Sequence, residues 1–415
     1  MSDDHFDALE TRDAAQREAD LFGALPAYLQ ASIQHSSGLR DHLSGFDLAS
    51  INSREQLAGL PVLRKAELME AQAKSPPFGG FANVSALGGS RVFMSPGPIW
   101  EPQGLGADPW GAARSLYAAG FRAGDVVHNA LSYHQTPGGF IMDEALRALG
   151  CTVFPAGIGN TEMQVEAARA LQPVAYVGTP DYLKVILDKA EEMSIDLSCI
   201  KRAMVSGGAL FPSMRQAYGE RGVNVMQAYA TADLGMVAYE TKADGALEEG
   251  MVINEGLIVE IVRPGTGDPV ETGEVGEILV TNFSETYPLV RFATGDLSAA
   301  LSEPSASGRT NMRIKGWMGR ADQRTKVKGM FVDPKQIDQI VKGDSSIAAA
   351  RLVITRKGSS DAMHLQVLPA DGAAVDLEAV EKSLRSVTNL GGTVEKVSDL
   401  PNDGKVIVDE RDYDA

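Results

Sequence analysis

Four segments of this chain combine glycines, hydroxyls and charged side chains in patterns that can do chemistry. The first joins VSGGAL at residues 205–210 to QAYATADLG at residues 227–235. Paired glycines after an apolar strand let a flat ring approach the backbone, and Tyr229 offers it an aromatic face. Thr231 and Asp233 add a hydroxyl and a carboxylate, oxygen groups that suit phosphate and Mg²⁺. The alternative is that these residues only shape strand ends.

The other three segments contribute charge. In YPLVRFATGDLS, residues 287–298, Asp296 follows a tight Thr-Gly turn at a strand end and can accept two ribose hydroxyls, or it simply closes the turn. GRADQRTKVKG, residues 319–329, places an Arg and an Asp at a presumed domain junction, where a charge run is otherwise a solvated linker. Lys405 follows a Pro-Asn-Asp-Gly turn, and a lone lysine there is usually an exposed surface residue.

The elements that position these segments alternate between helix and strand from about residue 109 to residue 238. Such alternation predicts parallel strands joined by crossover helices, in an α/β fold. Ligands of open parallel sheets sit at the carboxyl ends of the strands. Those ends read VFPAGIGN, VGTPDY, VSGGAL and AYATAD, all rich in small or polar residues. The sequence therefore predicts that a polar ligand binds along this edge.

The regions before and after this sheet differ in their predicted secondary structure. Residues 1–75 are predicted to be a helical lead-in, with Leu21, Leu25, Leu29 and Ile33 one helical turn apart. Residues after 238 become β-rich, and the final stretch reads as a small α+β unit. We predict a large N-terminal domain, residues 1–322, with mixed or parallel sheets flanked by helices plus a β-rich part. A small α+β C-terminal domain, residues 323–415, would follow.

The composition excludes several classes of partner. The chain has 38 lysine and arginine residues against 55 aspartate and glutamate residues, a net charge of −17. That surplus argues against nucleic acid and against anionic membranes, both of which need clustered cations. Only Cys151 and Cys199 occur, which fits a reducing compartment. The polar, acidic N-terminus is unlike a signal peptide, and no apolar run reaches the roughly 20 residues of a membrane span, so a cytoplasmic location is expected.

The order and spacing of these segments resemble the phenylacetate–CoA ligase family of the adenylate-forming superfamily. YATAD is similar to that family's Tyr-Gly-x-Ser/Thr-Glu motif, RFATGD to its Arg-x-x-Thr-Gly/Arg-Asp motif, and GRADQ to its Gly-Arg-x-Asp-Asp hinge motif. The resemblance extends to LAGLPVLRKAEL and to YHQTPGGFIMDEALRALGCTVFPAGIGNTEMQ, and covers nearly the whole chain.

The resemblance implies an ATP-dependent carboxylic acid–CoA ligase that works through an acyl-adenylate. Residues 1–322 would be the adenylation domain and residues 323–415 a mobile lid. Tyr229 would stack near adenine, Asp296 would hold the ribose, and Asp233 would stand at the Mg²⁺ position. The nucleotide-binding residues implied are Ser206, Gly207, Gly208, Ala209, Ala228, Tyr229, Ala230, Thr231, Asp296 and Arg320.

Roles in the C-terminal part follow from the same resemblance. Asp322 would be the hinge about which the small domain rotates. Lys405 matches the lysine that bridges carboxylate and α-phosphate during adenylation. Lys326, Lys328 and Gly329 are candidates for the coenzyme A face. The implied cofactors are ATP, Mg²⁺ and coenzyme A.

The acid itself is not readable from the sequence, beyond an expectation that it is aromatic or similarly small. Tyr133, His134, Phe140 and Ile158 are candidates for its pocket, although a loop histidine such as His134 is more often solvated. The resemblance also suggests a homodimer.

The chain departs from the family pattern where ATP phosphates normally bind. FMSPGPIWEPQG, residues 93–104, stands in place of a Ser-Ser-Gly-Thr-Thr-Gly-type loop, and we predict a Pro-rich loop. Pro96 and Pro98 supply no N–H group, so the segment is not a conventional phosphate cradle. Glu101 adds a negative charge beside the phosphates, unhelpful unless it acts through Mg²⁺.

Smaller departures are Ala232 in place of a hydroxyl, Asp233 in place of Glu, and Gln323 in place of the second Asp after the hinge. Two alternatives therefore stay open. The chain could be a catalytically impaired or regulatory paralogue that binds nucleotide or acyl-CoA without adenylation. It could also be an acyltransferase that uses a preformed adenylate or another acceptor.

Overall fold

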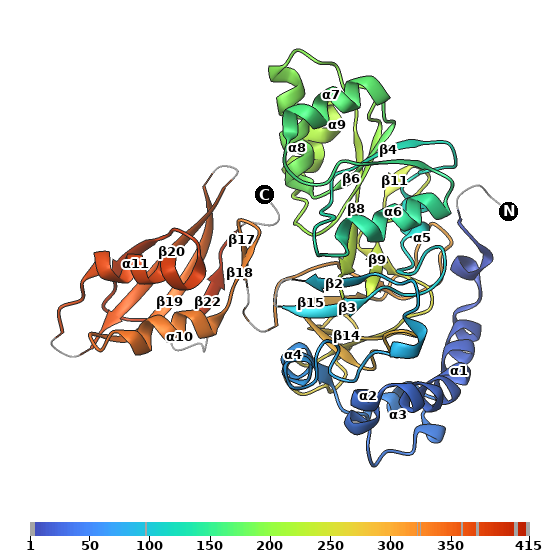
Figure 1. The fold of residues 1–415 in the computed structure, drawn as a ribbon, viewed down its shortest axis with the longest axis horizontal. Helices are drawn as coiled ribbons and strands as arrows, with labels where there is room; N and C mark the ends of the chain where they lie inside the picture. Colours follow the sequence, from blue (N-terminus) through green and yellow to red (C-terminus); the bar gives the residue numbers. More distant parts are fainter. Residues whose placement is uncertain are drawn as a thin grey trace. The chain divides into compact units, whose positions relative to one another are not determined.

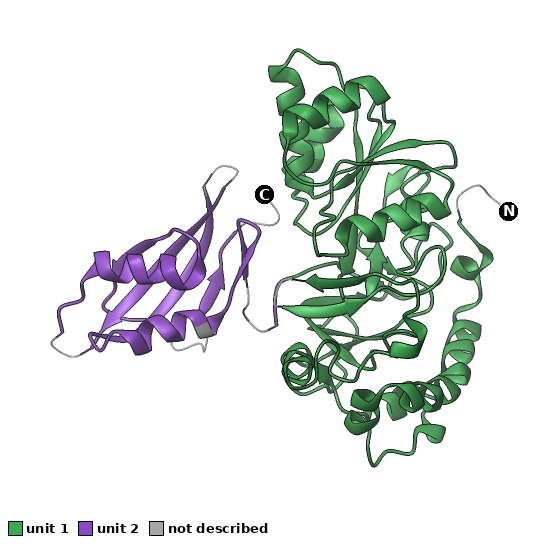
Figure 2. Cartoon of the chain, viewed as in Figure 1, with its two compact units in different colours: residues 1–318 green, residues 319–415 purple. Residues whose placement is uncertain are grey.

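The protein is described by a computed structural model that covers residues 5–95, 98–321, 323, 325–357, 360–370, 373–401 and 406–411. It divides into two compact units, residues 1–318 and 319–415 (Figure 2). This division falls slightly before the predicted boundary at residue 322. Asp322 and Lys405, two residues with predicted roles, lie outside the described residues.

Helices dominate the first 75 residues. They are α1 (Ala14–His35), α2 (Ser37–His42), α3 (Arg54–Ala58) and α4 (Lys65–Lys74), with short 3₁₀ turns at Ala8–Thr11 and Leu48–Ser50. A further 3₁₀ turn, Val84–Ala86, follows them. Asp13 caps α1 by accepting a hydrogen bond from the Gln16 backbone N–H. Leu25 and Leu29 of the predicted apolar stripe are fully buried, so the stripe faces the core of the large unit.

The predicted α/β alternation is confirmed. Parallel strands β4 (Val126–Asn129), β5 (Thr152–Pro155), β6 (Ala175–Gly178), β7 (Arg202–Val205) and β8 (Asn224–Thr231) lie in the order β8-β7-β6-β4-β5. The accompanying helices are α5 (Ala113–Ala118), α6 (Gly138–Ala148), α7 (Thr161–Leu171), α8 (Pro180–Glu192) and α9 (Pro212–Glu220) (Figure 1).

Helices cover both faces of these strands. Successive residues of a strand point to opposite sides of the sheet, so neighbouring residues enter different cores. Ala175 and Val177 of β6 join the core formed with α5 and α6, whereas Tyr176 joins the core formed with α7, α8 and α9. Such two-sided burial explains why the strands read as continuous apolar runs in the sequence.

The β-rich part continues the same sheet through antiparallel pairing. Its strands are β9 (Gly235–Tyr239), β12 (Met251–Ile253), β13 (Ile258–Val262), β14 (Val275–Thr281), β15 (Phe292–Leu301) and β16 (Arg313–Ile314), with β1 (Leu63–Arg64) added parallel to β15. β10 (Lys242–Ala243) and β11 (Ala246–Leu247) form a separate small hairpin. Within the described residues the main sheet has 12 strands, and β8 joins its parallel and antiparallel parts.

The prediction of a loop at residues 93–104 is wrong. Strands β2 (Val92–Ser95) and β3 (Ile99–Pro102) pair antiparallel, with Ser95 opposite Ile99 and Val92 opposite Pro102. A two-stranded hairpin has only edges, so it tolerates a proline in β3 that a central strand would not. The buried positions of these strands include Ser95 and Glu101, so no apolar alternation marked the strands in the sequence.

The C-terminal unit is an α+β fold with its own core. Strands β17 (Thr325–Val327) and β18 (Met330–Val332) form a hairpin, followed by α10 (Pro334–Gly343), β19 (Ile347–Lys357), β20 (Ser360–Pro369), α11 (Leu377–Thr388), β21 (Thr393–Lys396) and β22 (Ile407–Asp409). The main strands lie in the order β21-β20-β19-β22. Across the described residues, no helix has both the length and the apolar character that a membrane crossing needs.

Buried ion pairs tie the start of the chain to its distant β-rich part. Arg309 Nε donates to Glu10 Oε1 at 2.7 Å, with both side chains at most 3% exposed. Arg17 Nε donates to both oxygens of Glu255 at 3.1 Å. Since each of these charges is buried, each depends on its partner for stability.

Arg291 forms a similar tie at the start of β15. Its side chain donates to both oxygens of Glu260 at 3.0 Å and to the backbone carbonyls of Ala58, Leu60 and Gly267. The residue is only 2% exposed. One guanidinium thus holds β13, β15 and the turn before β1 together.

Candidate active site

The predicted nucleotide-binding segments meet at the carboxyl ends of β7 and β8. The two strands are neighbours, with Val205 opposite Gln227, so residues 206–209 and 228–231 lie beside each other. Gly207 has a φ of 72°, a conformation that favours glycine. The Gln227 side chain donates to the Gly208 carbonyl at 3.2 Å and holds the glycine turn against β8.

Asp296 is oriented by two hydrogen bonds. The Tyr229 hydroxyl donates to Oδ2 at 2.7 Å, and the Trp317 ring N–H donates to Oδ1 at 3.0 Å. Asp296 is 8% exposed. The structure therefore joins two predicted site residues directly. Trp317 was not identified from the sequence, although the GRADQ motif begins two residues after it.

Asp296 was predicted to lie in a turn at a strand end, and this prediction is wrong. It lies inside β15, which continues to Leu301. Gly295 has a φ of 73°, and the pairing of β14 with β15 shifts register between Glu277 and Leu279. The Thr-Gly-Asp sequence therefore makes an irregularity in a long strand, and such irregularities re-aim side chains at sites.

Replacing Asp296 by Asn should weaken AMP binding by about 10–100-fold, since hydrogen bonds to a charged group contribute about 1.5–3 kcal/mol. Calorimetric titration with AMP measures this affinity. Trp317→Phe is the matched control, because it removes one orienting donor and keeps the carboxylate, and it should cost less. AMP affinity of Asp296→Asn equal to the wild type, in a variant that melts normally, would contradict a ribose-binding role.

Asp233 lies in the turn between β8 and β9 and makes a salt bridge that the sequence did not suggest. Lys65 Nζ lies 3.0 Å from Asp233 Oδ2, and the Asp233 side chain is 2% exposed. The Thr231 hydroxyl oxygen accepts the Leu234 backbone N–H at 3.2 Å, which shapes the same turn. Lys65 is the first residue of α4. It falls in the stretch LPVLRKAEL, which the sequence analysis noted only as part of the family resemblance.

Glu101 of β3 is buried next to Asp233. Burial first, and then the negative charge of Asp233, raise the pKa of the Glu101 carboxyl well above its usual range. The Ser95 hydroxyl donates to Glu101 Oε1 at 2.7 Å. Among the described residues, Glu101 Oε2 and Asp233 Oδ1 are buried without a hydrogen-bond partner. Two carboxyl groups are thus buried beside each other, next to the Lys65 cation.

The backbone of Trp100 fixes this hairpin on α4. The Gln72 side chain accepts the Trp100 N–H at 2.8 Å and donates to the Trp100 carbonyl at 2.9 Å. The Tyr287 hydroxyl donates to the same carbonyl at 3.4 Å. Because α4 also supplies Lys65, one helix positions both the hairpin and the cation beside Asp233.

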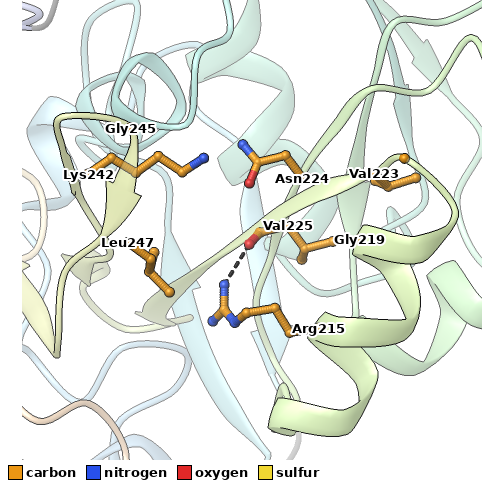
Figure 3. A pocket seen from close by; sticks show the side chains of 9 residues that line it. Arg215, Gly219, Val223, Asn224, Val225, Lys242, Gly245 and Leu247 are labelled. Carbon is orange, nitrogen blue, oxygen red and sulfur yellow. Dashed lines mark hydrogen bonds between the residues drawn. The ribbon is translucent and has the colours of Figure 1, made fainter.

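The predicted acid-pocket residues are only partly together. The rings of Tyr133 and Phe140 are 5.0 Å apart, and the Tyr133 hydroxyl donates to Asp143 at 2.9 Å. His134 is exposed, and Ile158 is 58% exposed. A cavity of about 420 Å³ lies elsewhere, at the start of β8 between α9 and the β10–β11 hairpin, and includes none of these four residues (Figure 3).

Of the residues predicted in the C-terminal unit, those that the structure describes, Arg320, Lys326, Lys328 and Gly329, lie on its first hairpin or just before it. Lys328 and Gly329 form the two-residue turn between β17 and β18, with φ values of 48° and 84° that suit such a turn. Lys326 is exposed on β17. The Arg320 guanidinium lies over the Phe331 ring, 5.9 Å from its centroid.

Gln323, one of the departures from the hinge motif, holds the backbone that follows Lys405. Its Oε1 accepts the N–H groups of Val406 at 2.7 Å and Ile407 at 3.3 Å. The hinge segment and the segment after the lysine are therefore linked inside the C-terminal unit.

Comparison with known proteins identifies the family. A family model described as AMP-binding enzyme matches residues 111–284. The phenylacetate–coenzyme A ligase of Pseudomonas putida is 30% identical over 330 residues, which cover 75% of this chain and 72% of that protein. The chain belongs to the phenylacetate–coenzyme A ligase family.

Other members of this family are similar over longer stretches. The phenylacetate–coenzyme A ligase of Aromatoleum evansii is 28% identical over 82% of this chain and 79% of that protein. Among solved structures, a 2-hydroxyisobutyryl-CoA ligase in complex with 2-HIB-AMP and CoA is 26% identical, with a TM-score of 0.79 over 97% of this chain and 92% of that one. The predicted adenylate-forming fold is thereby confirmed.

Proposed function

We propose that this member of the phenylacetate–CoA ligase family uses ATP to activate an aromatic or similarly small carboxylic acid and passes the acyl group to coenzyme A. Membership of this family supports the assignment of the protein as an AMP-forming acid–thiol ligase. The observation that carries the nucleotide part is the Tyr229–Asp296–Trp317 arrangement beside the Gly207–Gly208 turn.

The carboxylate of the acid is a poor electrophile, so it must be activated before a thiol can attack it. A carboxylate oxygen attacks the α-phosphate of ATP, the bond to pyrophosphate breaks, and an acyl-adenylate forms. Lys405 would neutralise charge on the carboxylate and α-phosphate, and Asp296 would fix the ribose. Positioning and charge neutralisation supply most of the rate in reactions of this kind.

The thioester step uses the second unit in our proposal. Rotation about Asp322 would bring Lys326, Lys328 and Gly329 to the coenzyme A side, where the thiol attacks the acyl carbon and AMP leaves. Arg320 would contact ribose or phosphate. We also propose a homodimer in the cytoplasm.

Mg²⁺ fits the residues present. The partnerless Asp233 Oδ1 is a hard, anionic ligand of the kind Mg²⁺ takes, and Glu101 Oε2 would become one when Glu101 loses its proton. When bound, the ion would supply positive charge to the phosphates. Asp233 and Glu101 are the residues that would hold it.

A second candidate function is a paralogue that binds nucleotide or acyl-CoA without adenylation. The β2–β3 hairpin favours it, since a buried carboxyl occupies the expected position of phosphate-binding N–H groups.

Pyrophosphate release decides between the two candidates. The assay uses ATP, Mg²⁺ and a panel of aryl and alkyl acids, with and without coenzyme A. We expect release with at least one small acid and thioester only when coenzyme A is present. No acid-dependent release with any acid, while AMP still raises the melting temperature, would favour the binding-only function.

A further inference from the structure

The cavity at the start of β8 lies apart from the proposed nucleotide site. It has a volume of about 420 Å³, and its walls come from α9, from the first residues of β8 and from the β10–β11 hairpin (Figure 3). Asn224 and Val225 line it and begin β8, whereas residues 228–231, at the other end of the strand, form the proposed nucleotide-binding segment. A molecule held in this cavity would therefore occupy a second site.

The charge of this cavity is positive. Of the described residues that line it, Arg215 and Lys242 are cations and none is acidic. Arg215 is held in place, since it donates to the Val225 carbonyl and to Glu240 Oε1, each at 2.6 Å. Together with the buried Glu240, the two cations leave one net positive charge in a chain whose net charge is −17. A concave surface of this sign attracts anions.

Lys242 supplies the charge that a ligand could use. Its ammonium makes no ion pair with any residue that the structure describes, and in Figure 3 it points across the cavity toward the Asn224 side chain. Burial first, and then repulsion from Arg215, lower the pKa of Lys242, and the attraction of Glu240 only partly offsets them. An anion beside this ammonium would favour its charged form.

Gly219 keeps the cavity open. A Cβ at this position would meet no atom within 4 Å outside its own helix. The residue lies inside α9, where alanine is favoured over glycine by about 1 kcal/mol. Gly222 and Gly245 also line the cavity, but their φ values of 76° and 80° suit glycine for the sake of the turns. What glycine provides at residue 219 is space.

The β10–β11 hairpin supplies an apolar wall. Among the described residues it pairs with no other strand, and Asp244 and Gly245 form its two-residue turn. Its base is closed by the Glu248 N–H, which donates to the Thr241 carbonyl at 3.0 Å. Leu247 is 39% exposed and lines the cavity. An apolar ligand group against Leu247 would therefore bury surface that the fold leaves open.

We propose that this cavity binds a small organic carboxylate, with its anionic group at Lys242 and Asn224 and its apolar part against Leu247. The Lys242 ammonium and the Asn224 amide are hydrogen-bond donors, whereas the Arg215 guanidinium already bonds its neighbours and contributes charge. A carboxylate carries one negative charge, which matches the net charge of the site, and a phosphate monoester carries nearly two. Apolar walls with a few polar groups are typical of small-molecule sites.

Labelling of lysines in the full-length protein tests this site. A limiting amount of acetic anhydride acetylates exposed amines, and mass spectrometry then gives the fraction of Lys242 that is modified. Benzoate or butanoate, titrated to about ten times its Kd, should lower Lys242 labelling about tenfold, because the bound protein hides this amine. Inorganic phosphate at the same concentration should protect it less. Lys201, an exposed lysine directly before β7, is the internal control and should be labelled equally throughout.

Filling the cavity should remove the protection. In Gly219→Leu, Lys242 should be labelled equally with and without the carboxylates, while Gly23→Leu, the matched control, should keep the wild-type protection. Gly23 lies inside α1, and a Cβ there also meets no atom within 4 Å. Melting temperatures check that both variants are folded.

Three results would overturn the inference. They are Lys242 labelling that neither carboxylate changes, stronger protection by phosphate than by either carboxylate, and protection that survives in folded Gly219→Leu. The site does not rest on the proposed function, since the labelling needs no nucleotide or coenzyme A. Protection of Lys242 together with no acid-dependent pyrophosphate release would keep this site and reject the ligase. Pyrophosphate release without protection of Lys242 would do the reverse.

Discussion

Replacing Lys405 by Ala should lower acid-dependent pyrophosphate release by about 10²–10³-fold, the loss typical when one group that stabilises transition-state charge is removed. The proposed lysine contacts the carboxylate and α-phosphate only during adenylation. AMP affinity and thioester formation from a supplied acyl-adenylate should therefore stay near wild-type values. Single-turnover assays of the two half-reactions measure these quantities separately.

Lys396→Ala is the matched control for that variant, since Lys396 is an exposed lysine on β21 of the same unit. It should leave both half-reactions unchanged. Gln323→Ala tests the same idea indirectly, because Gln323 holds the Val406 backbone directly after the lysine. It should slow adenylation more than thioester formation. Unchanged pyrophosphate release in Lys405→Ala would reject the role of Lys405.

Replacing Arg291 by Met should lower the free energy of unfolding of the large unit by about 3–5 kcal/mol, the usual cost of removing one partner of a buried ion pair. The variant leaves Glu260 buried, 7% exposed, and leaves three backbone carbonyls without their donor. Urea unfolding followed by fluorescence measures the change. If the variant does not fold, a loss of soluble yield reports the destabilisation instead.

The loss should also depend on pH. Burial raises the pKa of Glu260 above its usual range even with Arg291 present. Without Arg291 the folded state favours the protonated carboxyl still more. Because the folded pKa lies above the unfolded one, stability is retained at low pH and lost as pH rises, so the deficit should be smaller at pH 5 than at pH 8.

Glu260→Met with Arg291→Met is the control for the ion pair, since it removes both charges. It should recover part of the loss, and the remainder reports the three carbonyls. An Arg291→Met variant as stable as the wild type at pH 8 would show that the buried pair contributes nothing.

The α/β core could be predicted from sequence because its signals are local. Each strand of residues 126–231 is a short apolar run, and each helix has its own period and end signals, such as Gly150 after α6. The hairpin at residues 92–102 was missed because Pro98 and Pro102 are loop residues in most settings. Among the residues that the structure describes, no third strand pairs with this hairpin, and that makes proline acceptable in β3.

The site could be predicted only where a motif supported it. Tyr229, Asp233 and Asp296 were singled out by their chemistry at strand ends and given roles by the family resemblance, and the structure joins Tyr229 to Asp296 by a hydrogen bond. Lys65 and Glu101 reach Asp233 from segments 168 and 132 positions earlier in the chain. No spacing rule reports such contacts, because they depend on how α4 and the hairpin pack.

The ties between the first helices and the distant β-rich part determine when the protein can fold as the ribosome makes it. Glu10, Arg17 and the turn before β1 are bound by Arg309, Glu255 and Arg291, which lie 233 to 299 positions later in the chain. The amino-terminal helices must therefore wait, with apolar stripe exposed, until almost all of the large unit has left the exit tunnel. Contacts this far apart in sequence form slowly and leave nascent chains open to aggregation.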